Sequence, residues 1–107
     1  MTKSSLNPGQ RRTVEIIETL GFGFIERLSI RDGRPCYEPE PRLVQSIKLD
    51  SEPERQPDHI DDDLTLKKEF ESLFVQLRRL GDVTVDIEIR HTLPFRIVVE
   101  RRYEGLL

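Results

Sequence analysis

A chain of 107 residues with 36% hydrophobic and 35% charged residues has the size and polarity of one globular domain with a single modest core. It has no uninterrupted apolar run near the roughly 18 residues that cross a bilayer, and its first ten residues lack the apolar stretch of a signal peptide. We therefore expect a cytoplasmic protein without a membrane partner. The single cysteine, Cys36, excludes an intramolecular disulfide and any paired-cysteine metal or redox motif.

The net charge of −3 is unevenly distributed along the chain. Residues 50–63 carry seven acidic residues and one arginine, whereas residues 1–49 carry eight basic and six acidic residues. The acidic stretch also contains two prolines and only one aliphatic residue, a composition typical of a flexible segment. We therefore expect one domain over residues 1–107, in which a flexible acidic segment, 50–63, separates two slightly basic halves.

The start and stop signals of a first helix are found within residues 7–21. Asn7 is a suitable N-cap, Pro8 fits the first helical position, and Gln10 stands where it can complete a capping box. Gly21 supplies the left-handed residue that commonly ends a helix. The buried face is predicted from one stripe at helical spacing: Thr13, Ile16, Ile17 and Leu20.

Two strands are predicted from alternation of apolar and polar residues. In residues 22–31, Phe24 and Leu28 share the mostly apolar face, and Ile25 belongs to the opposite, outward face. Residues 42–50 alternate in the same way. The apolar side of this segment consists of Leu43, Ile47 and Leu49.

A hairpin connects the first strand to a short return strand. Asp32-Gly33 is a strong signal for a two-residue turn, because both turn positions need a positive φ. The turn predicts a return strand over residues 34–38, with Arg31 opposite Arg34. Prolines then end the strand, since proline cannot donate to a ladder.

The second helix is predicted over residues 64–80. Its stripe of apolar residues follows the helical period closely and consists of Leu66, Phe70, Leu73, Phe74 and Leu77. The negative charges of Asp61–Asp63 suit the N-terminus of this helix, and Gly81 ends it.

The last segment, residues 83–99, is predicted to be a β-hairpin. A single strand of that length would measure roughly 56 Å, which is too long for a domain with a radius of gyration of about 13 Å. A register that keeps the odd-numbered apolar residues on one face also places Glu88 opposite Arg96. It leaves residues 90–94 as a five-residue loop with His91 at the tip. The apolar pairs of this register are Ile89–Phe95, Ile87–Ile97 and Val85–Val99.

The order of the predicted elements suggests a degenerate repeat of two halves, each a helix followed by a hairpin. "IRDGRP" (residues 30–35) and "IRHTLP" (residues 89–94) share their first two residues and their proline. In such a repeat, the HTLP segment occupies the position of the Asp32-Gly33 turn.

No constellation in the sequence indicates an active site or a metal centre. His91 is assigned to a hairpin tip, His59 lies in the acidic segment, and neither belongs to a metal-binding motif. Asp61–Asp63 lack the alternate spacing and the glycine of a calcium loop. Cys36 is interpreted as a small hydrophobic residue. We therefore expect no catalytic residues, no metal, no cofactor and no small-molecule ligand.

Arginine is the most informative residue type, with thirteen arginines against four lysines. The last hairpin turns several polar residues to the outward face of the sheet, and three adjacent arginine pairs occur along the chain. The candidate interaction surface consists of Arg90, Arg96, Val98 and Arg102, together with Arg11, Arg12, Arg78 and Arg79.

The sequence predicts an α+β fold with the order α-β-β-β-α-β-β, in which two helices cover one face of a mainly antiparallel sheet of about five strands. For function we favour a small, non-enzymatic protein-interaction or regulatory module that forms homodimers and binds a protein partner through the sheet or the second helix. The alternative is an accessory RNA- or DNA-binding domain that uses the surface arginine pairs.

Overall fold

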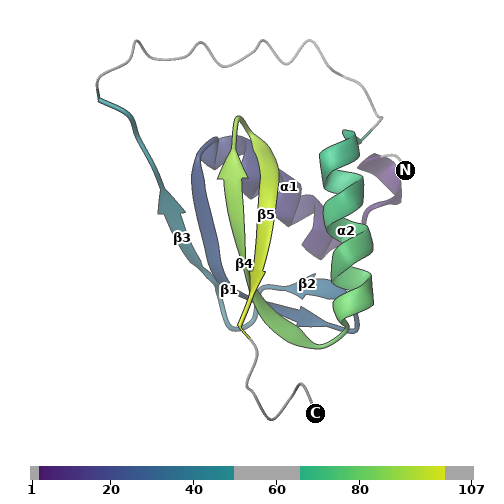
Figure 1. The fold of residues 1–107 in the computed structure, drawn as a ribbon. Helices are drawn as coiled ribbons and strands as arrows, with labels where there is room; N and C mark the ends of the chain where they lie inside the picture. The colour runs from purple at the N-terminus through teal and green to yellow at the C-terminus, as the bar shows by residue number, and fades with distance from the viewer. Residues whose placement is uncertain (1–2, 50–65, 101–107) are drawn as a thin grey trace.

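Two helices pack on one face of a five-stranded antiparallel sheet, and no other helix or strand of the described residues covers the opposite face (Figure 1). The computed structural model describes residues 3–49 and 66–100. This α+β architecture and the order of its elements confirm the sequence prediction. The acidic segment 50–63 lies outside the described residues. The elements are η1 (Lys3–Ser5), α1 (Pro8–Leu20), β1 (Gly23–Arg31), β2 (Arg34–Cys36), β3 (Arg42–Gln45), α2 (Lys68–Leu80), β4 (Val83–Arg90) and β5 (Leu93–Val99).

The strand order is β2-β1-β4-β5, and β3 also pairs with β1. β4 lies along one side of β1, while β2 pairs with residues 29–31 and β3 with residues 23–26 on its other side. Among the described strands, β5 pairs only with β4 and therefore forms an edge of the sheet.

The predicted signals of α1 are all present in the structure. The Gln10 amide donates to Asn7 Oδ1 at 2.8 Å and the Asn7 amide donates to Gln10 Oε1 at 3.0 Å, which completes the capping box. The Gly21 amide donates to the Ile17 carbonyl at 3.0 Å where the helix ends. The buried residues of the helix are Thr13, Val14 and Ile17, with Ile16 and Leu20 at the margin of the core.

The second helix begins later than predicted, at Lys68 instead of residue 64. Its N-cap, Lys67, has extended backbone angles and makes no side-chain capping hydrogen bond. Leu66 precedes the cap but is only 2% exposed. The hydrophobic stripe therefore extends beyond the helix, which is why it predicts a helix that begins too early. Asp61–Asp63 lie outside the described residues. The buried residues of α2 are Phe70, Leu73, Phe74 and Leu77.

A β-bulge in the middle of β1 corrects the predicted face of this strand. Between Ile25 and Leu28, Glu26 and Arg27 together face the single residue Asp86 of β4. The extra residue reverses the alternation, so Ile25 and Leu28 are both fully buried, and the prediction that Ile25 faces outward is wrong. The Arg27 amide donates to the Asp86 carboxylate at 2.8 Å and thereby fixes the bulge.

The third strand is shorter than the alternating pattern of residues 42–50 predicts. β3 ends at Gln45, and its pairing with β1 covers four residues. The apolar residues that the pattern placed on one side of a longer strand do not enter the core. Their exposed fractions are 48% for Leu43, 70% for Ile47 and 94% for Leu49.

The register of the last hairpin is confirmed in part. Ile89 pairs with Pro94 instead of the predicted Phe95, because Phe95 is the extra residue of a second bulge. The connection is therefore the two-residue turn His91-Thr92 and not a five-residue loop. Both turn residues have positive φ, 54° and 63°, as a type I′ turn requires. The confirmed pairs are Val85–Val99, Ile87–Ile97 and Glu88–Arg96.

The two helix-and-hairpin halves share two structural features. Each helix has 13 residues, and the hydrogen bonds that connect the halves are equivalent. The Gly33 amide donates to the Gly81 carbonyl at 3.0 Å, and the Thr92 amide donates to the Gly21 carbonyl at 2.9 Å. Each hairpin turn is thus attached to the glycine that ends the helix of the other half, so Gly33 and Thr92 occupy equivalent positions in the two hairpins.

Candidate functional site

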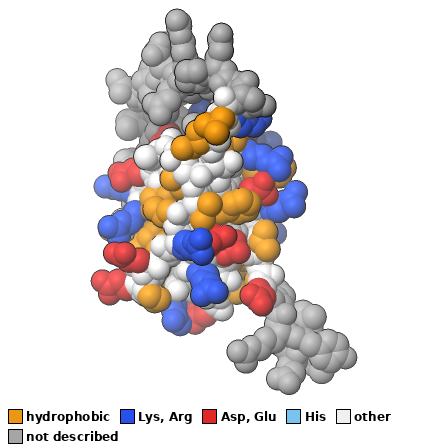
Figure 2. Space-filling view, turned by 90° about the vertical axis from the view of Figure 1, so that its left-hand side faces the viewer, with side chains coloured by type: hydrophobic (Ala, Val, Ile, Leu, Met, Phe, Trp, Pro, Cys, Tyr) orange, Lys and Arg blue, Asp and Glu red, His pale blue; other side chains and the backbone are white. Residues whose placement is uncertain are grey.

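The open face, which is the face of the sheet opposite the helices, carries both charged and apolar side chains (Figure 2). Directly opposed residues of an antiparallel ladder share a face, so the pairings define this surface. Val98 is 45% exposed there, and Phe95, at the bulge of β5, is 50% exposed. The structure therefore places the predicted residues Arg96 and Val98 on the open face, while Arg102 lies outside the described residues. The opposed pairs on this face include Phe24–Glu88, Glu26–Arg42, Asp86–Val98 and Glu88–Arg96.

Two of the predicted arginines converge on one aromatic ring. The guanidinium carbons of Arg90 and Arg96 lie 4.1 Å and 5.3 Å from the centroid of the Phe95 ring. Glu88 lies 2.8 Å from Arg90 Nε and 3.7 Å from Arg96 Nε, so its carboxylate partly neutralises both. We call these four residues the Phe95 cluster. It presents a planar apolar ring beside two cations, and aromatic residues and arginine are the types most enriched at protein interfaces.

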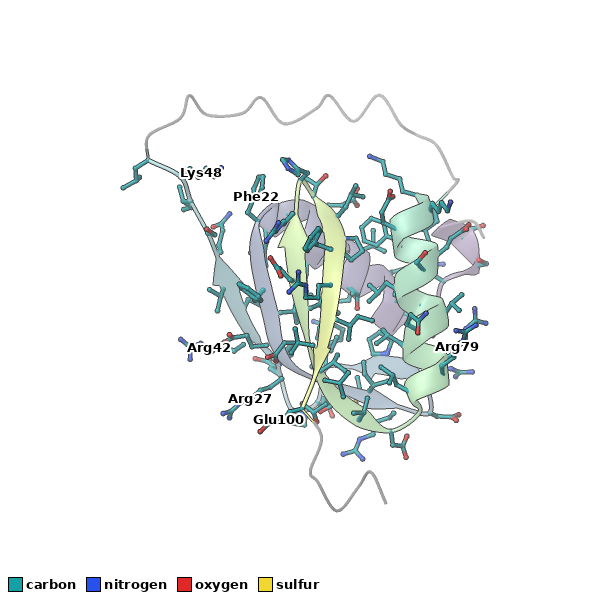
Figure 3. The ribbon with its side chains drawn as sticks, in the orientation of Figure 1. Phe22, Arg27, Arg42, Lys48, Arg79 and Glu100 are labelled. Atoms are coloured by element: carbon teal, nitrogen blue, oxygen red, sulfur yellow. The ribbon has the colours of Figure 1, made fainter. Side chains whose placement is uncertain are left out.

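A wide hollow of about 1320 Å³ lies at the end of the open face away from the β4–β5 turn. Arg27, Arg42 and Glu100 border this hollow (Figure 3), and Val98 lies between it and the Phe95 cluster. The Arg42 guanidinium Nε is 3.6 Å from Glu26 Oε1, and both groups are solvent-exposed. The open face therefore carries charges of both signs instead of presenting one sign.

The edge formed by β5 borders a groove of about 400 Å³ that separates this strand from α2. One wall is the side of α2 that runs from Glu69 to Leu80, and the other wall is β5 from Pro94 to Val99. Ile97 and Val99 are only partly buried at this position. The helix thus leaves the edge of the strand accessible, with apolar side chains next to it.

A second surface, the arginine hollow, lies where the first turns of α1 meet the β1–β2 hairpin. It has a volume of about 700 Å³ and is lined by Arg11 and Arg12 of α1, Arg31 and Arg34 of the hairpin, and two glutamates. Arg31 lies directly opposite Arg34 in the ladder, and like charges in directly opposed positions are destabilising. This arrangement leaves a local excess of positive charge.

The two arginines at the end of α2 diverge. Arg78 lies close to the hairpin turn, since a Cβ on Gly33 would be 2.7 Å from Arg78 Cα, but it does not line the arginine hollow. Arg79 points away from the sheet (Figure 3). The sequence reasoning grouped arginines by adjacency along the chain and missed Arg31 and Arg34. The signal that could have found them was the turn motif that places them opposite each other.

Tyr37 forms part of the same hollow and is held by a chain of hydrogen bonds. Thr13 Oγ1 donates to the Gly9 carbonyl at 2.8 Å, so the Tyr37 hydroxyl, 2.6 Å from Thr13 Oγ1, is the donor to that oxygen. The guanidinium of Arg12 lies 5.2 Å from the centroid of the Tyr37 ring. Burial raises the pKa of Tyr37 above its ordinary value of 10.0, although the Thr13 hydrogen bond and the charge of Arg12 act in the opposite direction.

The raised pKa of Tyr37 predicts a specific loss of stability in alkaline solution. The folded state holds the phenol proton more tightly than the unfolded state, so this contribution is present below pH 10 and is lost as the pH rises through the folded pKa. The Tyr37→Phe variant lacks the titrating phenol, and all other titratable groups are the same in the two proteins. In urea unfolding, the stability advantage of the natural protein over this variant should therefore shrink above pH 10. An unchanged difference would contradict the assignment.

His91 and Cys36 are not brought together. The His91 ring is exposed in the β4–β5 turn and packs edge-on against Phe22, with 4.9 Å between the ring centroids. Cys36 is partly buried at the end of β2, where its thiol donates to the Glu38 carbonyl at 3.4 Å. These elements lie at opposite ends of the domain (Figure 1). His91 therefore serves as a turn residue, whereas Cys36 lines the arginine hollow.

Within residues 3–49 and 66–100, the histidine, cysteine and acidic side chains form no group of three or more that could hold a metal ion. The same part of the chain contains no helix with the length and hydropathy to cross a membrane. In comparisons with known proteins, no family model, no curated protein and no solved structure matches this chain.

Proposed function

We propose that this protein is a small, non-enzymatic protein-interaction or regulatory module that functions as a homodimer and binds through the uncovered surface of its sheet. The observation that carries the proposal is the position of two large exposed apolar residues, Phe95 and Val98, on the strand that forms the edge of the sheet. Apolar side chains beside an unpaired strand edge favour a protein contact.

The chemistry of the open face supports the same conclusion. Protein interfaces combine aromatic residues and arginines at their centre with a polar rim, and the Phe95 cluster lies on a face that carries charges of both signs. A surface that carries both signs suits a partner that also carries both signs, and a second copy of the chain meets this requirement.

Size-exclusion chromatography with light scattering tests the proposal directly. The chain has a mass of 12.6 kDa, and we expect the protein to elute with twice this mass and to dissociate on dilution. A measured molar mass equal to that of a single chain at every concentration would overturn the proposal of a homodimer.

A second candidate function is favoured by the arginine hollow. Four arginines from α1, β1 and β2 line it, and the directly opposed pair Arg31 and Arg34 would be stabilised by a bound phosphate group. An accessory RNA- or DNA-binding domain would use this surface. Its binding would weaken steeply with salt and would be lost in an Arg31→Ser, Arg34→Ser variant but retained in Arg42→Ser, Arg79→Ser. Absence of binding at low salt would exclude this candidate.

A further inference from the structure

We propose that β5 is the dimer interface and that it pairs antiparallel with β5 of a second copy, with the twofold axis passing through Val98. The two sheets then form one continuous sheet with all helices on the same side. This inference rests on the proposed function, since it names the strand and the register through which the module self-associates.

The accessible part of the edge is the second half of β5. In the first half, Pro94 has no amide to donate and Phe95 forms a bulge, and both features interrupt pairing at an edge. From Arg96 to Val99 the strand is regular, with one residue of β4 opposite each residue of β5. Natural sheets protect such regular edges with charge, proline or cover, but the run from Ile97 to Val99 is entirely apolar.

This half of the strand is complementary to itself. When Val98 lies on the twofold axis, Arg96 lies opposite the partner's Glu100, and the same pair occurs again across the axis. Arg96, Val98 and Glu100 all belong to the open face, so these pairs can make contact. Val98 then meets its own copy, and its exposed surface becomes buried. In one direction, a register shifted by two residues places Arg96 opposite Val98 and one shifted by four residues places Arg96 opposite itself, and both lose the two attractive pairs.

The same register fits the other face of the edge. Ile97 and Val99 point toward the helices, where they line the groove between β5 and α2. In the dimer, Ile97 lies opposite the partner's Val99, so these apolar side chains also become covered. Glu88 of β4 already lies 3.7 Å from Arg96 Nε, and the partner's Glu100 would extend this contact into a row of alternating charges across three strands.

The opposite edge of the sheet offers no comparable self-pairing. Leu43 is 48% exposed on β3, which makes this edge the principal competitor. In the antiparallel registers that place the twofold axis on a residue of β3 and keep the helices on one side, Arg42 lies opposite the partner's Arg42, Val44, Ser46 or Lys48. None of these registers pairs Arg42 with an acidic residue, and the first and the last are repulsive. The attractive pairs that these registers allow, such as Glu40 with the partner's Lys48 in the register centred on Val44, involve residues two or more positions beyond the ends of β3.

Charge reversal at the two predicted partners tests the register. Arg96→Glu and Glu100→Arg should each weaken the dimer about tenfold, because each single variant places like charges opposite each other twice in the interface. The double variant Arg96→Glu, Glu100→Arg should restore the natural dissociation constant. Sedimentation equilibrium at low salt measures the constants, and Glu15→Arg, on the exposed side of α1, provides the matched change of charge away from the interface.

The outcomes separate this inference from the proposed function. A natural protein that dimerises, with variants that are unaffected or a double variant as weak as the single ones, overturns the β5 register while homodimer formation stands. A natural protein that remains a monomer overturns both. Glu100 lies beyond the end of β5 and is exposed, so Glu100→Arg should preserve the fold, which circular dichroism would verify.

Disulfide trapping gives a second readout that does not depend on charge. In a Cys36→Ser background, Val98→Cys should form a covalent dimer under mild oxidation, because the residue on the axis faces its own copy. Thr84→Cys in the same background is the control, since Thr84 is exposed on the open face but belongs to β4. Equal yields of covalent dimer from both variants, or no dimer from Val98→Cys, would contradict the proposed axis.

Discussion

Gly33→Ala is expected to lower the free energy of unfolding by about 3 kcal/mol, a large change for a domain of this size. Gly33 has a φ of +75°, which disfavours any residue with a Cβ. The added Cβ would also lie 2.7 Å from Arg78 Cα, so the hairpin turn would have to move away from α2. This movement would weaken the hydrogen bond from the Gly33 amide to the Gly81 carbonyl. Chemical denaturation of the two proteins measures the difference.

The equivalent position in the other half provides the control. Thr92 also has a positive φ, 63°, and its amide makes the corresponding hydrogen bond to the Gly21 carbonyl. Thr92→Gly relieves the strain of a β-branched residue and should raise stability by about 0.5 kcal/mol. We therefore expect Gly33→Ala to lower the free energy of unfolding and Thr92→Gly to raise it. Stability that is unchanged in Gly33→Ala would contradict the described attachment of the turn to α2.

Val98→Asp is expected to have the largest effect on self-association, a loss of at least about tenfold in dimer affinity. The side chain is 45% exposed in the monomer, so its replacement should change the folding stability of one chain little. In the dimer the two carboxylates would face each other at the twofold axis without partners. Light scattering over a dilution series measures the effect.

Leu43→Asp is the matched variant for this experiment. Leu43 is 48% exposed on β3, at the opposite edge of the sheet, so the same chemical change is made on a similarly accessible apolar residue. We expect it to leave the dimer intact. A dimer that is lost in Leu43→Asp but retained in Val98→Asp would place the interface on β3 and contradict the assignment to β5.

The sequence predicted the elements whose signals are local. The first helix begins at a capping box formed by Asn7 and Gln10, and both helices end at a glycine. The turn at Asp32-Gly33 was likewise predictable from two adjacent residues, although its amides also bond to the end of α2 and the residue after it. In each of these cases the residues that determine the structure are next to one another in the chain, so no tertiary information was needed.

The bulge in β1 could not be predicted, because it depends on a partner strand. Alternation defines the two faces of a strand only if no residue is inserted. Glu26 and Arg27 are ordinary strand residues in sequence, and their shared position becomes evident only when both are seen to face Asp86. One inserted residue was sufficient to move Ile25 from the predicted outward face into the core.

The His91-Thr92 turn agrees with the suggested repeat, whereas the register argument predicts a five-residue loop. That loop follows from keeping the odd-numbered apolar residues on one face and Glu88 opposite Arg96, and neither His91 nor Thr92 is typical of a type I′ turn. The alignment of residues 30–35 with residues 89–94 places these two residues where Asp32 and Gly33 form their turn. The tertiary hydrogen bond of the Thr92 amide explains how the chain tolerates an unfavourable residue there.

The candidate site was accessible to sequence reasoning only in part. Alternation along the last hairpin placed Arg96 and Val98 together on the outward face. Whether β5 forms an edge depends on the order of strands in the sheet, which no local pattern determines. The convergence of Arg90 on Phe95 depends on the second bulge, which the sequence does not indicate either.

Hydrogen–deuterium exchange of the β5 amides tests the central claim most directly. At protein concentrations well below the dissociation constant of the dimer, the outward amides between Arg96 and Val99 should exchange as those of an open strand edge. Well above that concentration, we predict strong protection confined to these residues, because they become paired with the second copy. Exchange in this segment that does not depend on concentration, while the protein is dimeric, would contradict the account.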